Sequence, residues 1–129
     1  LIDKSDLQNQ VSLIGPVDRE SVKDYYSTSN LMILPSISEG LARVIFESQV
    51  AMCPVLVTDA PGMSDIVIDG QTGYVFKSNN LDSLSLKIEY INNNYDEASL
   101  VAKNAKGFIL SNYSEDNFKF SFKKLFDTV

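Results

Sequence analysis

The sequence contains no histidine and only one cysteine. The missing histidines remove the commonest general base and metal ligand from the whole chain, so any acid–base chemistry rests on carboxylates. The single cysteine, Cys53, cannot form an internal disulfide, and it stands beside Pro54 at the start of an apolar run, where a small buried thiol fits. These features predict a chain of the reducing cytoplasm.

Positive charge is also scarce: 11 Lys and Arg face 17 Asp and Glu, for a net charge of −6. This balance works against broad binding to nucleic acid or to an anionic membrane. Three lysines, Lys119, Lys123 and Lys124, alternate with phenylalanines and are interpreted as the solvated edge of a packed helix. No stretch approaches the roughly 18 to 20 apolar residues of a membrane span, and no signal-peptide pattern is present. We expect a cytoplasmic protein without a nucleic-acid partner, and membrane association of a longer protein stays open.

The hydrophobic residues make up 44% of the 129 positions and are spread along the chain, which predicts one soluble domain over residues 1–129. Continuous apolar runs that alternate with helical patterns are typical of parallel strands covered on both faces. The first half shows predicted strands at Val11–Gly15, Leu31–Leu34 and Pro54–Thr58, a helix capped by Asp18 with Val22, Tyr25 and Tyr26 on one face, and a helix over about residues 42–52.

The second half predicts one more strand followed by helices. A short helical turn at Ser64–Val67 and a turn at Asp69–Gly73 lead to a strand at Tyr74–Phe76. Three apolar stripes at helical spacing follow. They are Leu81, Leu84, Ile88 and Ile91; Ala98, Val101, Ala105, Phe108 and Ile109; and Phe118, Phe122, Leu125 and Phe126. The predicted class is α/β: a Rossmann-like three-layer αβα fold with a short, mostly parallel sheet of about four strands and C-terminal helices.

Residues 35–47 lie where an open parallel sheet binds ligands, outside the carboxyl ends of its strands. Gly40 permits close approach of the backbone, and the amides from Leu41 to Val44 at a helix start suit phosphate oxygens. Arg43 stands in the first helical turn, where the helix dipole disfavours a cation by about 0.3–1 kcal/mol unless an anion offsets it. Simple exposure of Arg43 to solvent is an equally good interpretation of that position.

Two glutamates, Glu39 and Glu47, lie eight residues apart in this stretch, one in the loop and one about a turn into the helix. Both can face one crevice and accept hydrogen bonds from sugar hydroxyls. Such a spacing is common on its own, and two solvated charges are then the simpler interpretation. Asp59, Asp65 and Asp69 offer oxygen atoms as well, but their spacing fits no calcium loop.

The wider pattern resembles the carboxyl-terminal domain of the family-four retaining glycosyltransferases, which have the GT-B fold. The resemblance covers roughly residues 11–76 and rests on an ordered series: Pro35-Ser36, Glu39-Gly40, Glu47, Pro54–Asp59, Gly62, Asp65–Val67 and Asp69–Gly73. It implies that Glu39 is the catalytic residue on the donor sugar and that Glu47 binds the ribose of the nucleotide. It implies further that Gly40, Leu41, Ala42, Arg43 and Val44 meet the sugar and the diphosphate, and that neither a metal nor another cofactor is needed.

The sequence departs from the family pattern at several places. Gln49–Met52 replaces a run of small residues with Gly two before the proline, Pro61 stands where Gly is usual, and Leu41-Ala42 replaces a more usual aromatic or Leu followed by Pro or Gly. The resemblance also implies that this chain lacks two strands, which in the family lie between the strands that match Val11–Gly15 and Leu31–Leu34. It implies further that a basic Arg/Lys pair and an acceptor-binding N-terminal domain lie outside this chain. We therefore expect an incomplete GT-B domain that is inactive alone, with an open sheet edge suited to self-association.

The function that these patterns favour is transfer of a hexosyl unit from a nucleoside-diphosphate sugar to a glycan, lipid or polysaccharide precursor, by an enzyme of which this chain is part. One alternative is a non-catalytic nucleotide-binding or partner module built on a degenerate GT-B half-domain. Another is a flavodoxin-like signalling domain, which an early acidic cluster after the first strand would favour; no such cluster is present.

Overall fold

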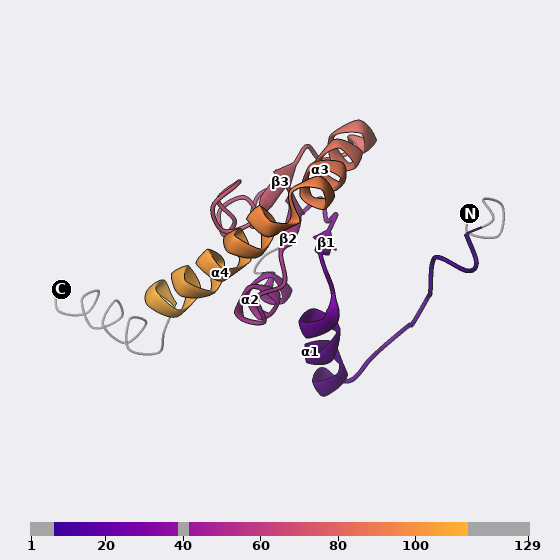
Figure 1. Ribbon diagram of the computed structural model, residues 1–129, viewed down its shortest axis with the longest axis horizontal. Coiled ribbons are helices and arrows are strands. Elements are labelled where there is room, and N and C mark those ends of the chain that lie inside the picture. The colour runs from indigo at the N-terminus through magenta and orange to yellow at the C-terminus, as the bar shows by residue number, and fades with distance from the viewer. Residues whose placement is uncertain (1–6, 39–41, 114–129) are drawn as a thin grey trace.

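The computed structural model describes residues 7–38 and 42–113. Within these residues, strands and helices alternate in the first half and two long helices close the fold (Figure 1). In chain order the elements are α1 (Arg19–Thr28), β1 (Met32–Leu34), α2 (Arg43–Val50), β2 (Val55–Thr58), β3 (Tyr74–Phe76), α3 (Leu81–Asn93) and α4 (Tyr95–Asn112).

The three strands form one parallel sheet in the order β1-β2-β3. Leu56 of β2 is in register with Ile33 of β1 and with Tyr74 of β3. Every residue of β2 is buried, as a central parallel strand requires when both faces of the sheet are covered. The predicted parallel sheet of continuous apolar strands is thus confirmed.

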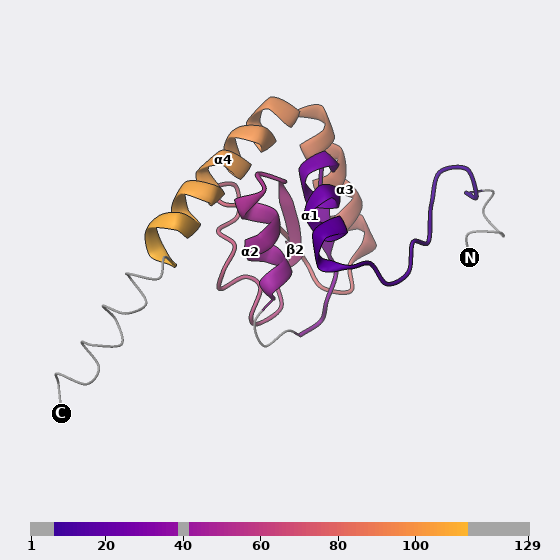
Figure 2. The ribbon, with the colours of Figure 1, turned by 90° about the horizontal axis from the view of Figure 1, so that it is seen from below.

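Helices cover both faces of the sheet. On one face Val55 and Val57 of β2 pack in a cluster with Ile45 of α2. On the other face Leu56 of β2 packs in a second cluster with Ile91 of α3. In Figure 1, α1 and α2 lie below the strands and α3 lies above them, and Figure 2 shows α1 and α2 side by side with α4 running on beyond α2. This arrangement confirms the predicted three-layer α/β class.

The predicted strand at Val11–Gly15 is wrong in this structure, and the sheet has three strands among the described residues instead of about four. Residues 11–18 have no regular secondary structure, and Leu13 is 85% exposed. The physical reason is a lack of partners: a strand needs neighbouring peptide groups, and β1 pairs with β2 alone in the described sheet. Residues 11–15 have the apolar composition of a strand, but no strand of the described structure lies beside them to pair with.

Two further predictions concern the segments after β2 and after α4. The predicted helical turn at Ser64–Val67 lies within consecutive turns over residues 61–66, where the amide of Val67 donates a helical hydrogen bond to the carbonyl of Met63 at 3.0 Å, but no regular helix forms. Pro61 begins this segment, and Gly62 follows it at a φ of 86°, a left-handed conformation that a helix does not continue. The predicted α3 and α4 helices are confirmed, and Leu84, Ile88 and Ile91 of the first stripe pack on the core, whereas Leu81 is 78% exposed. The third stripe from Phe118 to Phe126 lies outside the described residues.

The C-terminus of α2 is closed by a Schellman motif with an unusual residue in its key position. The amide of Cys53 donates to the carbonyl of Ser48 at 3.0 Å, and the amide of Met52 donates to the carbonyl of Gln49 at 3.1 Å. Met52 itself has a φ of 60°. Glycine usually occupies this left-handed position because a Cβ is strained there. Met52 is therefore a site of backbone strain at the end of α2.

The turn before β3 needs glycine for a different reason, which is space. An added Cβ on Gly73 would lie 2.5 Å from Val55 Cγ2, 2.7 Å from Val67 Cγ1 and 3.1 Å from the carbonyl oxygen of Val55. Gly73 also accepts a hydrogen bond from the amide of Gly70 at 2.8 Å, which closes the turn. The final glycine of the Asp69–Gly73 motif thus lets the turn pack directly on the central strand.

We expect Met52→Gly to raise the free energy of unfolding by about 0.5–1 kcal/mol. The substitution relieves a left-handed strain of about 1–2 kcal/mol, and the extra flexibility of glycine in the unfolded chain offsets part of this gain. Met52 is 51% exposed, so little packing is lost. Denaturant unfolding measures the difference. The matched control is Ala51→Gly, at a φ of −74°, which should destabilise; equal losses for both variants would contradict the strain at Met52.

We expect Gly73→Ala to lower the free energy of unfolding by about 1–3 kcal/mol, the usual cost of overpacking a core. Gly107→Ala is the control, because a Cβ added to that glycine of α4 meets nothing within 4 Å. Alanine should stabilise the α4 position by about 0.5–1 kcal/mol through its higher helix propensity. Thermal or denaturant unfolding of both variants decides the matter, and a harmless Gly73→Ala would refute the close approach.

Candidate functional site

The candidate site lies at the carboxyl edge of the sheet, where the chain leaves β1 and enters α2. The hydroxyl of Thr58, the last residue of β2, donates to the carbonyl of Ser36 at 2.6 Å. This bond fixes the segment after β1 to the end of the central strand. The predicted site residues Glu39, Gly40 and Leu41 lie outside the described residues, and Ala42, Arg43, Val44 and Glu47 lie within them.

The N-terminus of α2 has no side-chain cap. Its N-cap residue is Ala42, and its first turn contains no acidic residue. By contrast, Asp18 and Asn80 accept hydrogen bonds from the first-turn amides of α1 and α3. Arg43 is exposed at the start of α2, so the helix dipole and this cation both present positive charge at the edge of the sheet. Such an end suits a phosphate group.

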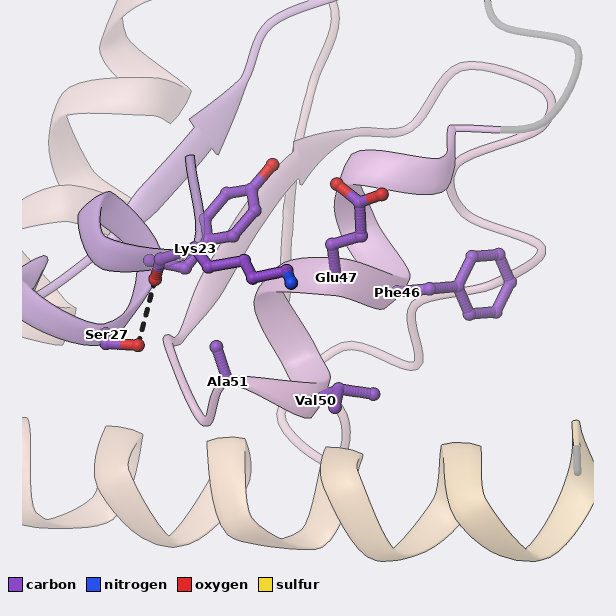
Figure 3. A pocket seen from close by; sticks show the side chains of 7 residues that line it. Lys23, Ser27, Phe46, Glu47, Val50 and Ala51 are labelled. Carbon is purple, nitrogen blue, oxygen red and sulfur yellow. Dashed lines mark hydrogen bonds between the residues drawn. The ribbon is translucent and has the colours of Figure 1, made fainter. Parts of the chain in front are cut away.

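Glu47 lies about one turn further along α2 and lines a pocket of about 390 Å³ between α1 and α2. Lys23, Tyr26 and Ser27 form the α1 side, and Phe46, Glu47, Val50 and Ala51 form the α2 side. Figure 3 shows the Lys23 side chain extended from α1 toward Glu47 of α2, with the Phe46 ring on the far side of Glu47. Most of the wall is apolar, and a few polar groups stand on it, as in typical small-molecule sites.

Three polar groups of this pocket are not bonded to one another. Among the described residues, the Tyr26 hydroxyl, the Lys23 ammonium and the Glu47 carboxylate share no hydrogen bond or ion pair. Burial raises the pKa of the Tyr26 hydroxyl, and the nearby negative charge of Glu47 raises this pKa further. Tyr26 therefore keeps its proton at neutral pH and can donate a hydrogen bond. These groups are available to a ligand that has both donors and acceptors.

Sequence reasoning did not identify the α1 side of this pocket. The helical spacing grouped Tyr26 with Val22 and Tyr25 as one apolar face, but Tyr25 is 43% exposed and does not line the pocket. Which residue of α1 meets Glu47 depends on how two helices pack, and no motif encodes this packing. The signal that the sequence offered was a pair of adjacent tyrosines, Tyr25 and Tyr26, in the predicted helix that precedes the helix of Glu47.

A family model described as glycosyl transferases group 1 matches residues 1–124, which is nearly the whole chain. The chain belongs to this family. The resemblance that the sequence motifs predicted is therefore confirmed at the level of the family.

Curated relatives of the chain are considerably longer. An uncharacterized glycosyltransferase of Methanocaldococcus jannaschii is 30% identical over 100 residues, which are 78% of this chain and 28% of the relative. The capsular polysaccharide biosynthesis glycosyltransferase CapM of Staphylococcus aureus is 26% identical over 90 residues, which are 70% of this chain and 24% of CapM. The chain thus spans about a quarter of the length of these relatives.

Solved structures of similar fold are GT-B glycosyltransferases. Anabaena HepE in complex with UDP and glucose matches with a TM-score of 0.86 and 19% identity, over 99% of this chain and 35% of HepE. A glycosyltransferase from Rickettsia africae matches with a TM-score of 0.86 and 25% identity, over 98% of this chain and 34% of that protein. The predicted fold class, an incomplete GT-B C-terminal domain, is confirmed.

The three aspartates that follow β2 do not come together in the described structure. Asp59 accepts hydrogen bonds from the amide and hydroxyl of Ser78 at 2.8 and 2.7 Å. Asp65 accepts from the amide of Gly62 at 3.2 Å, and Asp69 forms an ion pair with Lys87 at 2.9 Å. Each carboxylate therefore holds its own turn or helix.

None of the helices in residues 7–38 and 42–113 combines the length and the apolar character that a membrane crossing requires.

The hydrogen bonds from Ser78 lower the pKa of Asp59, and the side-chain bond is the larger cause. We expect Ser78→Ala to raise this pKa toward its ordinary value, as followed by NMR titration of the carboxyl carbon. Because the pKa of Asp59 is lower in the folded than in the unfolded protein, the interaction stabilises the fold at pH values above the unfolded pKa. This stabilisation is lost as the pH falls through the folded pKa. Ser85→Ala, at an exposed serine of α3, is the control. An unchanged Asp59 pKa in Ser78→Ala would contradict the role of the Ser78 hydroxyl.

Proposed function

We propose that this chain forms the donor-nucleotide half of a glycosyltransferase that transfers a hexosyl unit from a nucleoside diphosphate. The observation that carries the proposal is the position of Glu47: the second glutamate of the family pattern lines the pocket between α1 and α2. A carboxylate on a mostly apolar wall suits a nucleoside, because the ribose hydroxyls donate to the carboxylate and the flat base covers apolar surface.

The remaining roles follow from the geometry at the start of α2. The uncapped amides of that helix and the exposed Arg43 would hold the diphosphate, next to the ribose on Glu47. Negative charge develops on the leaving diphosphate during transfer, and preoriented amides and a cation stabilise this charge. Glu39, Gly40 and Leu41 lie outside the described residues, and we assign Glu39 to the sugar on the resemblance alone.

Known relatives guide the class of substrate that we propose. HepE has been solved with UDP and glucose and with UDP-glucose, and CapM is a capsular polysaccharide biosynthesis glycosyltransferase. For the present chain we propose a nucleoside-diphosphate hexose as donor and a glycan or polysaccharide precursor as acceptor. Because the chain spans about a third of the solved relatives' chains, we expect acceptor binding to need additional sequence and the 129 residues alone not to catalyse transfer.

Calorimetric titration of the chain with UDP, GDP and ADP tests the proposal. We expect saturable binding of one of them, and a loss of about tenfold in affinity in Glu47→Gln. A hydrogen bond to a charged acceptor contributes about 1.5–3 kcal/mol, and the neutral amide retains part of it.

Glu89→Gln is the matched control, because Glu89 is an exposed glutamate of α3 outside the pocket. It should bind the nucleotide as the unchanged chain does. Absence of binding to all three nucleotides by a sample with a cooperative unfolding transition would overturn the donor site. Equal affinity of Glu47→Gln and the unchanged chain would remove the ribose role of Glu47.

A further inference from the structure

The α1 side of the pocket contains a polar group that the proposed function does not use. Tyr26 lines the pocket from α1, opposite the residues that α2 contributes, and its side chain is half-buried. Its hydroxyl has no hydrogen-bond partner among the described residues. A tyrosine that buries its ring usually finds a partner for its hydroxyl, so the unbonded group is available to whatever fills the pocket.

Glu47 and Tyr26 are complementary in hydrogen bonding. An ionised carboxylate only accepts hydrogen bonds, whereas a phenol hydroxyl both donates and accepts. Burial raises the pKa of the Tyr26 hydroxyl, and the charge of Glu47 raises this pKa further, which helps to keep the hydroxyl protonated. A ligand with two adjacent hydroxyls can donate one to Glu47 and place the other against Tyr26.

We propose that Tyr26 is a second ribose ligand, facing Glu47 across the α1–α2 pocket, and that the two residues together select ribonucleotides over deoxyribonucleotides. The inference rests on the proposed function, because it needs a nucleoside diphosphate in this pocket. The apolar wall of Phe46, Val50 and Ala51 then covers the nucleoside, and the vicinal diol bridges the two helices.

The alternative is a purely structural Tyr26, whose ring fills space between the helices. The two roles differ in what the hydroxyl contributes. Because the hydroxyl bonds to nothing in the described structure, its removal should leave the unfolding temperature unchanged in either case. If Tyr26 binds the ribose, however, the affinity lost on removing its hydroxyl must depend on which ribose hydroxyls the nucleotide carries.

The test is a set of titrations with the nucleotide that binds best among UDP, GDP and ADP, and with its 2′-deoxy and 3′-deoxy counterparts. We expect Tyr26→Phe to weaken binding of the ribonucleotide about fivefold, the usual loss for a neutral hydrogen bond. The same variant should bind one of the two deoxy counterparts within twofold of the unchanged chain. This pattern is a double-mutant cycle between protein and ligand hydroxyls.

Tyr25→Phe is the matched control, because Tyr25 is the neighbouring tyrosine of α1 and does not line this pocket. It should leave all three affinities unchanged. If Tyr26→Phe weakens all three nucleotides equally, or none of them, while Glu47→Gln still lowers affinity, the inference fails and the donor site stands. If the folded chain binds no nucleoside diphosphate, the donor site fails and the inference fails with it.

Discussion

Burial of β2 on both faces is the constraint on which the rest of the structure depends. Val55, Leu56 and Val57 are each at most 1% exposed, and they alternate between the two apolar clusters. Hydrogen bonds also fix both ends of the strand: the amide of Met32 in β1 donates to the carbonyl of Pro54, and the hydroxyl of Thr58 donates to the carbonyl of Ser36 in the segment after β1. The loop that leaves β1 toward the site therefore starts from a position that the core fixes.

Helix α2 connects the core to the candidate site. Its buried residue Gln49 donates from Nε2 to the carbonyl of Thr72 at 2.8 Å, which links the helix to the turn before β3. Gln49 Oε1 has no partner in the described structure, and an unpaired buried acceptor costs about 1–3 kcal/mol. The strained Met52 ends the same helix. The chain thus tolerates two unfavourable features in the second half and at the end of α2, while the uncapped start of the helix lies at the carboxyl edge of the sheet.

The sequence predicted those features that depend on local pattern. The continuous runs at Leu31–Leu34 and Pro54–Thr58 predicted parallel strands because burial on both faces leaves a direct compositional trace. The helices α3 and α4 were predictable from their apolar spacing. Val11–Gly15 has the same composition as a strand, yet it is exposed. Whether an apolar run becomes a strand depends on a neighbour to pair with, and a single segment contains no information about that neighbour.

The candidate site divides in the same way between local and nonlocal information. Glu47 was found through a motif, because its spacing from Glu39 is written in the sequence. The groups facing it were not, because Lys23 and Tyr26 meet Glu47 only through the packing of α1 on α2. Departures from the family pattern at Gln49 and Met52 were visible in the sequence, but their consequences were not. A hydrogen bond to Thr72 and a left-handed backbone both require three-dimensional context.

Weak packing of α1 gives the pocket a further property. No residue of α1 is fully buried, although the helix is well capped by Asp18. A helix of ten residues gains its stability chiefly from tertiary contacts, and α1 contacts α2 beside the mostly apolar groove that the two helices line. A nucleoside in that groove would contact both helices and remove apolar surface from water, at roughly 25 cal/mol per Å². Binding and docking of α1 would therefore favour each other, since a ligand stabilises the arrangement for which it has the higher affinity.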